Sequence, residues 1–241
     1  MAISGGPDIL TDGLQLHLDA ADEHSYRSAT SINNLVTNIG GYGYFSGNTS
    51  LGNFNAGTIN ISGAGGTTTN DGCVFLGTTN NFNIGNSINN GNDFTSCGWL
   101  YRTTNDSGEV LNYRNSPFRL TFDISNNWMH FYQRETVSPY TMRSIAVSVT
   151  NSLNKWDYFV VSRSGTTFSF YKNGIFVDSR TMTFTETISS TFFSIGYAWT
   201  DDDYTSAAMD GSIGPVSHYT RALSASEILQ NYNATKGRYG L

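Results

Sequence analysis

Residues Trp156–Met182 read WDYFVVSRSGTTFSFYKNGIFVDSRTM, and this stretch decides the fold class. Asn173-Gly174 stands between the β-rich runs TFSFYK and IFVDSR, and Ser164-Gly165 stands before the first of these runs. Asn-Gly between such runs is typical of a type I′ hairpin turn, because both central residues must adopt positive φ. The stretch therefore predicts three consecutive strands in an antiparallel meander.

Alternation of apolar and polar residues continues on both sides of this meander and predicts further strands. These are expected at Gly13–Ala20, Phe94–Thr103, Phe118–Ile124, Trp128–Arg134, Ser144–Val149, Phe192–Trp199 and 209–219. Asn126-Asn127 separates two of them and favours a second hairpin. Antiparallel strands in this number, with no helical pattern between them, predict an all-β fold with two facing sheets.

The chain of 241 residues suits one large all-β domain. We expect an N-terminal arm over residues 1–12 and a single sandwich domain over 13–241. Residues 27–93 are rich in Gly, Asn, Ser and Thr, but large apolar residues recur through them more densely than a flexible linker needs. We therefore interpret 27–93 as a loop-rich part of the domain, with short strands joined by glycine turns.

The end of the chain, YTRALSASEILQNYNATKGRYGL, contains the one helix that the sequence predicts. Ser224 and Glu227 have the Ser-x-x-Glu spacing of a capping box, and Leu223 and Ile228 have the spacing of a hydrophobic staple. Ile228, Leu229 and Tyr232 are expected to face the sheets, and Gly237 marks the latest end of the helix. Such a short helix is marginal alone, so it must dock on the sandwich.

Composition limits the classes of partner. The 13 Lys and Arg against 19 Asp and Glu give a net charge of −6 and form no basic cluster, so no nucleic-acid partner is expected. No apolar run approaches the length of a membrane span, and MAISGGPDILTDG does not resemble a signal peptide, so neither a membrane role nor classical secretion is expected. Cys73 and Cys97 are too few for a disulfide framework or a four-cysteine zinc site; buried free thiols are favoured over a bridge.

Four stretches together resemble the laminin-G-like, or concanavalin A-like, superfamily of lectin and glucanase folds: GLQLHLDAAD, FTSCGWLYRT, KWDYFVVSRSGTTFSFYKNGIFV and AAMDGSIGPVSHYTRALSASEI. The resemblance implies a jelly-roll sandwich with one short C-terminal helix, and residues 27–93 match it poorly. The head and tail of the chain also resemble the versions of this domain found in bacteriophage and marine-virus structural proteins. This likeness implies a module for decoration, fibre or adhesion in a virion that is assembled in the host cytoplasm.

The glucanases of this superfamily make a glycoside hydrolase an alternative function. Their chemistry needs two carboxylates at controlled spacing, which an acid-x-acid pattern along one strand supplies. None of the five glutamates, Glu23, Glu109, Glu135, Glu186 and Glu227, has a carboxylate two residues away. The four histidines also lie far apart in the sequence, and no Gly-x-Ser-x-Gly motif is present. We therefore expect a protein that is not an enzyme and has no catalytic residues.

The acidic stretch TDDDYTSAAMD supplies the candidate site residues. Asp201, Asp202, Asp203 and Asp210 concentrate oxygen donors of the type that Ca²⁺ prefers, although a solvated acidic turn is the commoner outcome. Trp199 and Tyr204 flank the aspartates and could stack on sugar rings, although Trp199, as an alternating strand residue, could instead belong to the core. Ca²⁺ is the only cofactor that the sequence indicates.

The sequence thus favours a non-enzymatic virion module that binds other virion proteins and host-surface carbohydrate. A homo-oligomer or multi-copy assembly is expected, because repetition strengthens weak sites. The alternative is a free-standing carbohydrate-binding lectin.

Overall fold

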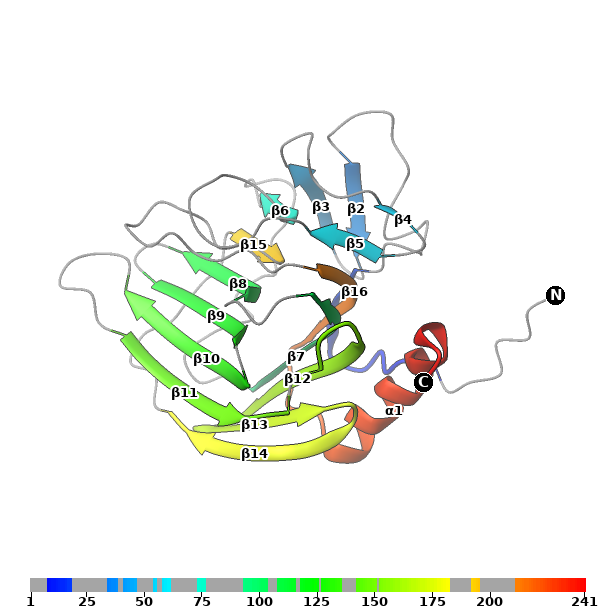
Figure 1. Cartoon of the computed structure of the whole chain (residues 1–241). Helices are drawn as coiled ribbons and strands as arrows, with labels where there is room; N and C mark the ends of the chain where they lie inside the picture. Colours follow the sequence, from blue (N-terminus) through cyan, green and yellow to red (C-terminus); the bar gives the residue numbers. More distant parts are fainter. Residues whose placement is uncertain are drawn as a thin grey trace.

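The computed structural model is drawn in Figure 1. It describes residues 8–18, 34–38, 41–46, 54–55, 58–61, 73–76, 93–103, 108–115, 118–125, 127–135, 142–150, 152–182, 192–195 and 211–241. Two antiparallel eight-stranded sheets lie face to face, and one helix follows the last strand. The all-β sandwich predicted from the alternation is confirmed.

Sheet A contains the meander that the sequence predicts. Its order is β14 (Ile175–Thr181), β13 (Thr167–Lys172), β12 (Trp156–Ser164), β7 (Phe94–Arg102), β16 (Gly211–Tyr219), β5 (Thr58–Ile61) and β4 (Phe54–Asn55). Strand β1 (Leu14–Leu18) also pairs with β16, beside β5. At the β13–β14 turn, Asn173 and Gly174 have φ of 53° and 76°, which the Asn-Gly pair requires for a type I′ turn.

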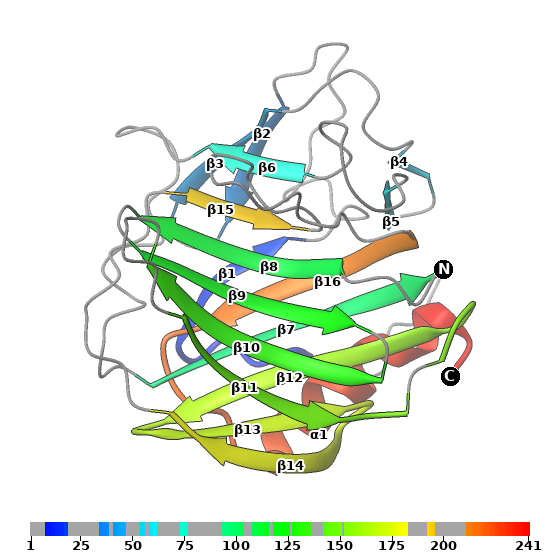
Figure 2. The same cartoon turned by 60° about the vertical axis from the view of Figure 1, so that its left-hand side comes forward.

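Sheet B lies opposite sheet A, as Figure 2 shows. Its order is β11 (Met142–Ser148), β10 (Trp128–Glu135), β9 (Phe118–Ser125), β8 (Gly108–Asn115), β15 (Phe192–Ile195), β6 (Cys73–Leu76), β3 (Gly41–Ser46) and β2 (Asn34–Asn38). Strands β9 and β10 form the hairpin predicted at Asn126-Asn127. Strands β2 to β6 confirm that the segment 27–93 contains short strands that join both sheets.

The core between the sheets is built from aromatic rings. Phe94 of β7, Phe168 of β13 and Phe131 of β10 are buried, and the Phe131 ring centroid lies 5.7 Å from that of Phe94 and 4.9 Å from that of Phe168. His218 of β16 is stacked on Phe94 in the same layer. Since residues two apart on a strand share a face, every second residue of each of these strands points into this core.

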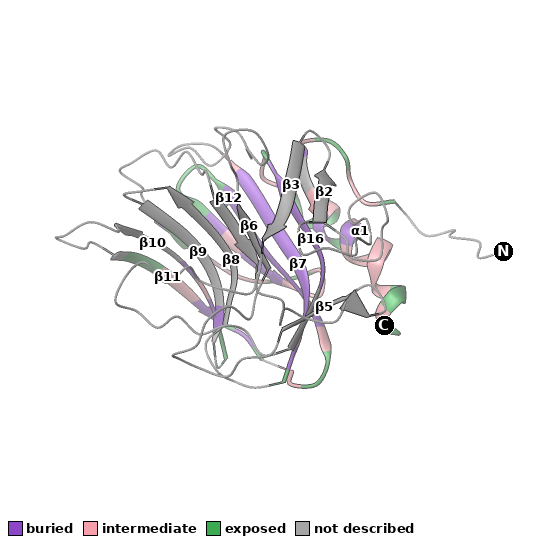
Figure 3. Ribbon diagram, turned by 90° about the horizontal axis from the view of Figure 1, so that it is seen from above, coloured by how far each residue is buried: buried purple, intermediate pink, exposed green. Residues whose placement is uncertain are grey.

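A third layer covers the opposite face of sheet A. Helix α1 (Ala225–Thr235) and a 3₁₀ helix (Lys236–Tyr239) pack on it, so β7 and β12 are buried along nearly their whole length (Figure 3). Trp99 is fully buried in this layer, with ring centroids 5.2 Å from Tyr158, 5.6 Å from Tyr232 and 4.4 Å from Tyr239. This packing supplies the docking that the short helix needs.

The prediction for the apolar face of α1 was right for two residues and wrong for the third. Ile228 is buried, and Tyr232 stacks on Trp99. Leu229 is 43% exposed, because it lies one residue, about 100°, around the helix from Ile228. A Cβ added to Gly174 would lie 2.9 Å from Leu229 Cδ1, so Leu229 covers the turn between β13 and β14 at the edge of the sheet. No helix among the described residues has the length and apolarity to cross a membrane.

Candidate functional site

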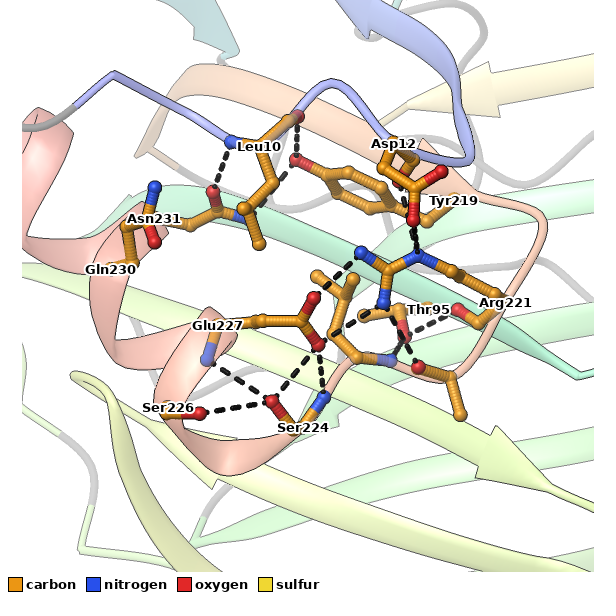
Figure 4. A network of polar contacts seen from close by, with 12 residues as sticks. Leu10, Asp12, Thr95, Tyr219, Arg221, Ser224, Ser226, Glu227, Gln230 and Asn231 are labelled. Atoms are coloured by element: carbon orange, nitrogen blue, oxygen red, sulfur yellow. Dashed lines mark hydrogen bonds and ion pairs between the residues drawn. The ribbon is translucent and has the colours of Figure 1, made fainter.

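The outer face of sheet A is closed by an ion pair and a helix cap. Arg221, just after β16, donates from its two terminal guanidinium nitrogens to the two carboxylate oxygens of Glu227, at 2.7 Å and 3.0 Å (Figure 4). Glu227 also accepts from the Ser224 backbone N–H at 2.8 Å, and its own N–H donates to Ser224 Oγ, which confirms the capping box. The hydrogen bonds from Arg221 are the main reason that the pKa of Glu227 is lowered to about 2.

The N-terminal arm crosses the same face. The Leu10 N–H donates to Asn231 Oδ1 at 2.9 Å, and the Tyr219 hydroxyl donates to the Leu10 carbonyl at 3.0 Å. Asn231 Nδ2 in turn donates to the Tyr219 hydroxyl oxygen at 3.0 Å, so arm, strand and helix share one network (Figure 4). The arm and the helix therefore cover this face over β7, β12 and β16.

The face of sheet B that points away from sheet A, the outer face of sheet B, is different. On β10, Met129 and Phe131 are fully buried and point toward sheet A. Trp128 and His130 alternate with them and therefore lie on the outer face of sheet B. Trp128 is 44% exposed, and its ring centroid lies 6.4 Å from that of His130.

Trp128 and His130 form an accessible aromatic platform. His130 is half-buried, and this burial lowers the pKa of its imidazole, so the ring is neutral at pH 7. An accessible aromatic face with a neutral hydrogen-bonding ring beside it suits an uncharged ligand that has both apolar and polar surface. These two residues were not predicted from the sequence, although the alternation in WMHFYQR places both on the face opposite Met129 and Phe131.

The strand register places acidic residues on one side of His130 only, because its partner on β11 is Ala146. Asp123 of β9 is directly opposite His130, and Glu109 of β8 is directly opposite Asp123. Directly opposed residues in antiparallel strands have Cβ atoms about 4.5–5.5 Å apart. Two acidic residues are thus paired across strands, and the pattern along a single strand does not contain this pairing.

The site residues predicted from the sequence lie outside the described residues. Trp199, Tyr204, Asp201, Asp202, Asp203 and Asp210 all fall in 196–210. This segment joins β15 of sheet B to β16 of sheet A. Among the residues that the structure describes, no three His, Cys, Asp or Glu side chains lie together in a way that could hold a metal ion.

The topology relates this segment to the platform. Strand β15 ends at Ile195, which is paired with Leu111, near the start of β8. Strand β10 begins with Trp128 at the same end of sheet B, because it runs antiparallel to β9 and parallel to β8. Three strand spacings, about 14 Å, separate β15 from β10. Strand β15 therefore ends at the end of sheet B where Trp128 lies.

The buried titratable groups are structural. Cys97 is a buried free thiol, as predicted, and burial raises its pKa to about 11, so it is not a nucleophile at neutral pH. His218 donates or accepts a 2.8 Å hydrogen bond with Ser96 Oγ through Nδ1, and burial lowers its pKa to about 3. Both groups are enclosed by sheet A and the layers that pack on it.

Comparison with known proteins identifies relatives of the fold. A family model described as the concanavalin A-like lectin/glucanases superfamily matches residues 76–229. No curated protein matches the chain. Among solved structures, the chain is similar to the botulinum neurotoxin serotype D binding domain, with a TM-score of 0.65 and 15% identity over 93% of this chain and 52% of that one.

Two related structures give a similar result. One, titled "Cell entry of botulinum neurotoxin type C is dependent upon interaction with two ganglioside molecules", has a TM-score of 0.64 and 14% identity, covering 92% of this chain and 51% of that one. The other is the binding domain of botulinum neurotoxin DC in complex with SialylT, with a TM-score of 0.64 and 13% identity over 92% of this chain and 52% of that one. The chain thus spans about half the length of these binding domains, and at such identities the likeness is one of fold.

Proposed function

Because the chain belongs to the concanavalin A-like lectin/glucanases superfamily, we propose that it is a non-enzymatic glycan-binding module of a virion surface. The observation that carries the glycan-binding part is the Trp128–His130 platform on the outer face of sheet B. A sugar presents C–H groups on its ring faces and hydroxyls around its rim. The Trp128 ring can stack on the C–H groups, and the neutral His130 ring can hydrogen-bond to the hydroxyls.

We propose that the segment 196–210 extends this site. It follows β15, which ends at the Trp128 end of sheet B, and Trp199 and Tyr204 would contribute further rings to the same glycan. Asp201, Asp202, Asp203 and Asp210 would hold Ca²⁺, for which carboxylate and carbonyl oxygens are the preferred ligands. Cell entry of the type C toxin depends on interaction with two ganglioside molecules, and the DC binding domain is in complex with SialylT; the gangliosides support a search among glycans first.

The virion part rests on the likeness of the first and last stretches of the chain to viral versions of the domain. In this role the module would bind other virion proteins in many copies and present the outer face of sheet B to host-surface carbohydrate. Purified particles should contain the chain at a fixed copy number. Its absence from particles would leave a free-standing lectin as the function.

A glycan array measures the binding directly, with Ca²⁺ and again with a chelator. We expect Trp128→Ala to abolish the signals of the unchanged protein while its melting temperature stays close to the original, and Trp199→Ala to weaken them. Phe176→Ala is the matched control, because Phe176 is an equally accessible ring, 52% exposed, on β14 of sheet A. An array without signals, or one on which Phe176→Ala acts like Trp128→Ala, contradicts the proposed site.

A glycoside hydrolase is the second candidate, favoured by the register that opposes Glu109 to Asp123. Hydrolysis needs one of two such groups as acid and the other as base or nucleophile. Incubating the protein with each glycan that it binds, followed by mass spectrometry, distinguishes the two functions. Shortened products that disappear with Glu109→Gln would establish the hydrolase, whereas intact glycans support the binding module.

A further inference from the structure

Strand β14 is the last strand of sheet A, and among the described residues no strand pairs with its outer edge. Figures 1 and 2 both show β14 at the margin of the molecule. The free edge of a strand presents backbone N–H and C=O groups that a strand of another chain can pair with, and lysine or proline often protects such an edge. The seven residues of β14, IFVDSRT, include neither, so β14 is a candidate for pairing with another chain.

Only part of β14 has the regular geometry that pairing needs. Residues 178–181 pair one to one with residues 167–170 of β13, but a bulge nearer the turn leaves Val177 without a paired residue. A bulge disrupts the regular ladder of hydrogen bonds. An incoming strand would therefore pair with the stretch 178–181 and not with the start of β14.

The backbone groups of Ser179, within this stretch, point away from β13. The Met182 N–H donates to the Thr166 C=O at 2.9 Å, just beyond the ends of β13 and β14. Residues of an antiparallel strand alternate between facing one neighbouring strand and facing the other. Ser179 precedes Met182 by three residues, so its N–H and C=O face the free edge.

The two side chains next to Ser179 bond to these groups. The Ser179 N–H donates to Asp178 Oδ1, and Arg180 Nη1 donates to the Ser179 C=O, both at 2.8 Å. Asp178 and Arg180 also form an ion pair at 2.6 Å, and each side chain is 44% exposed. They thus occupy the positions that the backbone of a paired strand would take.

Exposed apolar side chains lie at the turn end of the same strand. Ile175 is 69% exposed, more than any other large apolar side chain that the structure describes, and Phe176 follows it. Leu229 of α1, also exposed, lies beside Gly174 at the turn. Exposed apolar groups that gather in one place mark surfaces of interaction.

The stretch Asp178-Ser179-Arg180 is complementary to itself. When two copies of β14 pair antiparallel about a two-fold axis through Ser179, Asp178 of each copy lies opposite Arg180 of the other. Directly opposed residues have Cβ atoms about 4.5–5.5 Å apart, and opposite charges there are favourable. An axis through Asp178 or through Arg180 would instead place like charges opposite each other. The charges therefore select one register.

We infer that β14 pairs with β14 of a second copy of this chain, about a two-fold axis through Ser179, so that the two A sheets become continuous. The N–H and C=O of each Ser179 bond to the C=O and N–H of the other, and Asp178 and Arg180 pair across the axis. Every polar group of the stretch thus exchanges a partner within its own chain for an equivalent one. The contact is small, so the association is weak and depends on concentration. It does not depend on the proposed glycan binding.

Sedimentation velocity of the full chain, over concentrations from about 1 µM to 1 mM, measures the association. We expect an equilibrium between monomer and dimer. Arg180→Asp alone, and Asp178→Arg alone, should each weaken the dimer about 10-fold or more, because both opposed pairs then carry like charges. Their melting temperatures should stay close to that of the unchanged protein, since both side chains are exposed.

Two further samples separate the contact between copies from effects within one chain. A mixture of the Arg180→Asp and Asp178→Arg proteins should form a dimer, because each acidic residue of one chain then lies opposite an arginine of the other. The double variant should form a dimer by itself for the same reason. Arg238→Asp is the matched control: it makes the same change of charge at an exposed arginine of the 3₁₀ helix and should leave the association unchanged.

Each contrary result overturns the inference in a distinct way. A chain that stays monomeric over the whole range has no such contact. Equal effects of Arg180→Asp and Arg238→Asp, or a mixture that stays monomeric, would assign any association to another surface. Stronger association of Arg180→Asp than of the unchanged protein would show that Asp178 and Arg180 keep the edge from pairing. None of these results changes the expected signals on the glycan array.

Discussion

Sheets A and B are built from the same kind of alternating strand, yet their outer faces have opposite environments. On sheet A, Trp99 is fully buried beneath α1 and Tyr239. On sheet B, Trp128 is 44% exposed. Figure 3 shows that α1 lies on the side of sheet A that faces away from sheet B. The outer face of sheet A thus contributes to stability, whereas that of sheet B leaves the Trp128 ring accessible to solvent.

Replacing each of the two tryptophans should give the largest difference in the free energy of unfolding. Trp99→Ala should lower the free energy of unfolding by about 3–5 kcal/mol, because it leaves a cavity among Tyr158, Tyr232 and Tyr239 and removes the hydrogen bond to Thr235. Trp128→Ala should lower it by about 1 kcal/mol at most, since the site is partly solvated already. Urea denaturation followed by circular dichroism measures both.

Equal losses for the two variants would contradict the contrast between the outer faces. If Trp99→Ala does not fold, Tyr239→Phe provides a milder probe of the same layer. A Cβ added to Gly214 would clash with the Tyr239 hydroxyl and lie 2.9 Å from Trp99 Cβ, so Gly214→Ala should also disturb this layer and leave the Trp128 platform unchanged.

Two histidines extend the comparison to pH dependence. His218 is completely buried between the sheets, and burial lowers its pKa from 6.5 to about 3. Below pH 6.5 the unfolded chain therefore takes up a proton that the folded protein does not, so the contribution of His218 to stability is complete above pH 6.5 and declines toward pH 3. The slope is about 1.4 kcal/mol per pH unit. The pKa of His130 is also lowered by burial, but His130 is only half-buried.

Denaturation curves between pH 7 and 5 test this difference, since carboxylates change little there. Between pH 7 and 5 the unchanged protein should lose about 2 kcal/mol of stability because of His218. The variant His218→Asn should not show this part of the loss, whatever its stability at pH 7. His130→Asn should remove less. A larger change of slope for His130→Asn would show that the two environments have been assigned wrongly.

The smallest expected effect concerns the helix that covers sheet A. Ser224→Ala should cost about 1 kcal/mol, because the Glu227 N–H loses its partner at the start of α1. Ser226→Ala, two residues later, should change stability less, since alanine suits the first turn of a helix. Urea denaturation at pH 7 compares the two variants, and equal losses would argue against a capping role for Ser224.

Acid should weaken the same cap. The pKa of Glu227 is lowered to about 2 from 4.5, so its contribution is complete above pH 4.5 and is lost as pH falls toward 2. The difference between the unchanged protein and Glu227→Gln should therefore shrink over this interval. A difference that stays constant down to pH 2 would show that the carboxylate is not ion-paired with Arg221.

Local patterns were enough for much of the fold. The Asn173-Gly174 turn, the meander around it, the hairpin between β9 and β10 and the Ser224–Glu227 capping box each depend on neighbours in the sequence, and each was predicted. The family resemblance of these stretches also led to the right superfamily. The same reasoning placed Leu229 on the buried side of α1 and was wrong, because the rotation of a docked helix depends on what it packs against.

The candidate site was less predictable. The residues chosen from the sequence, Trp199, Tyr204 and the nearby aspartates, form one acidic stretch and lie outside the described residues. The Trp128–His130 platform was missed, because alternation assigns residues to two faces without saying which of them another layer will cover. Trp99 and Trp128 each stand in an alternating strand, and only the docking of α1 separates them.

The sequence by itself determined the strands, their turns, the helix cap and the acidic net charge, since these follow from residues close together in the chain. Only the tertiary structure decided which residues meet across strands. The pairing of β7 with β16, and of β8 with β15, joins strands far apart in the sequence and arises from the register between strands. The core-facing residues and the turns of the whole sheet together fix that register, and no single segment contains it.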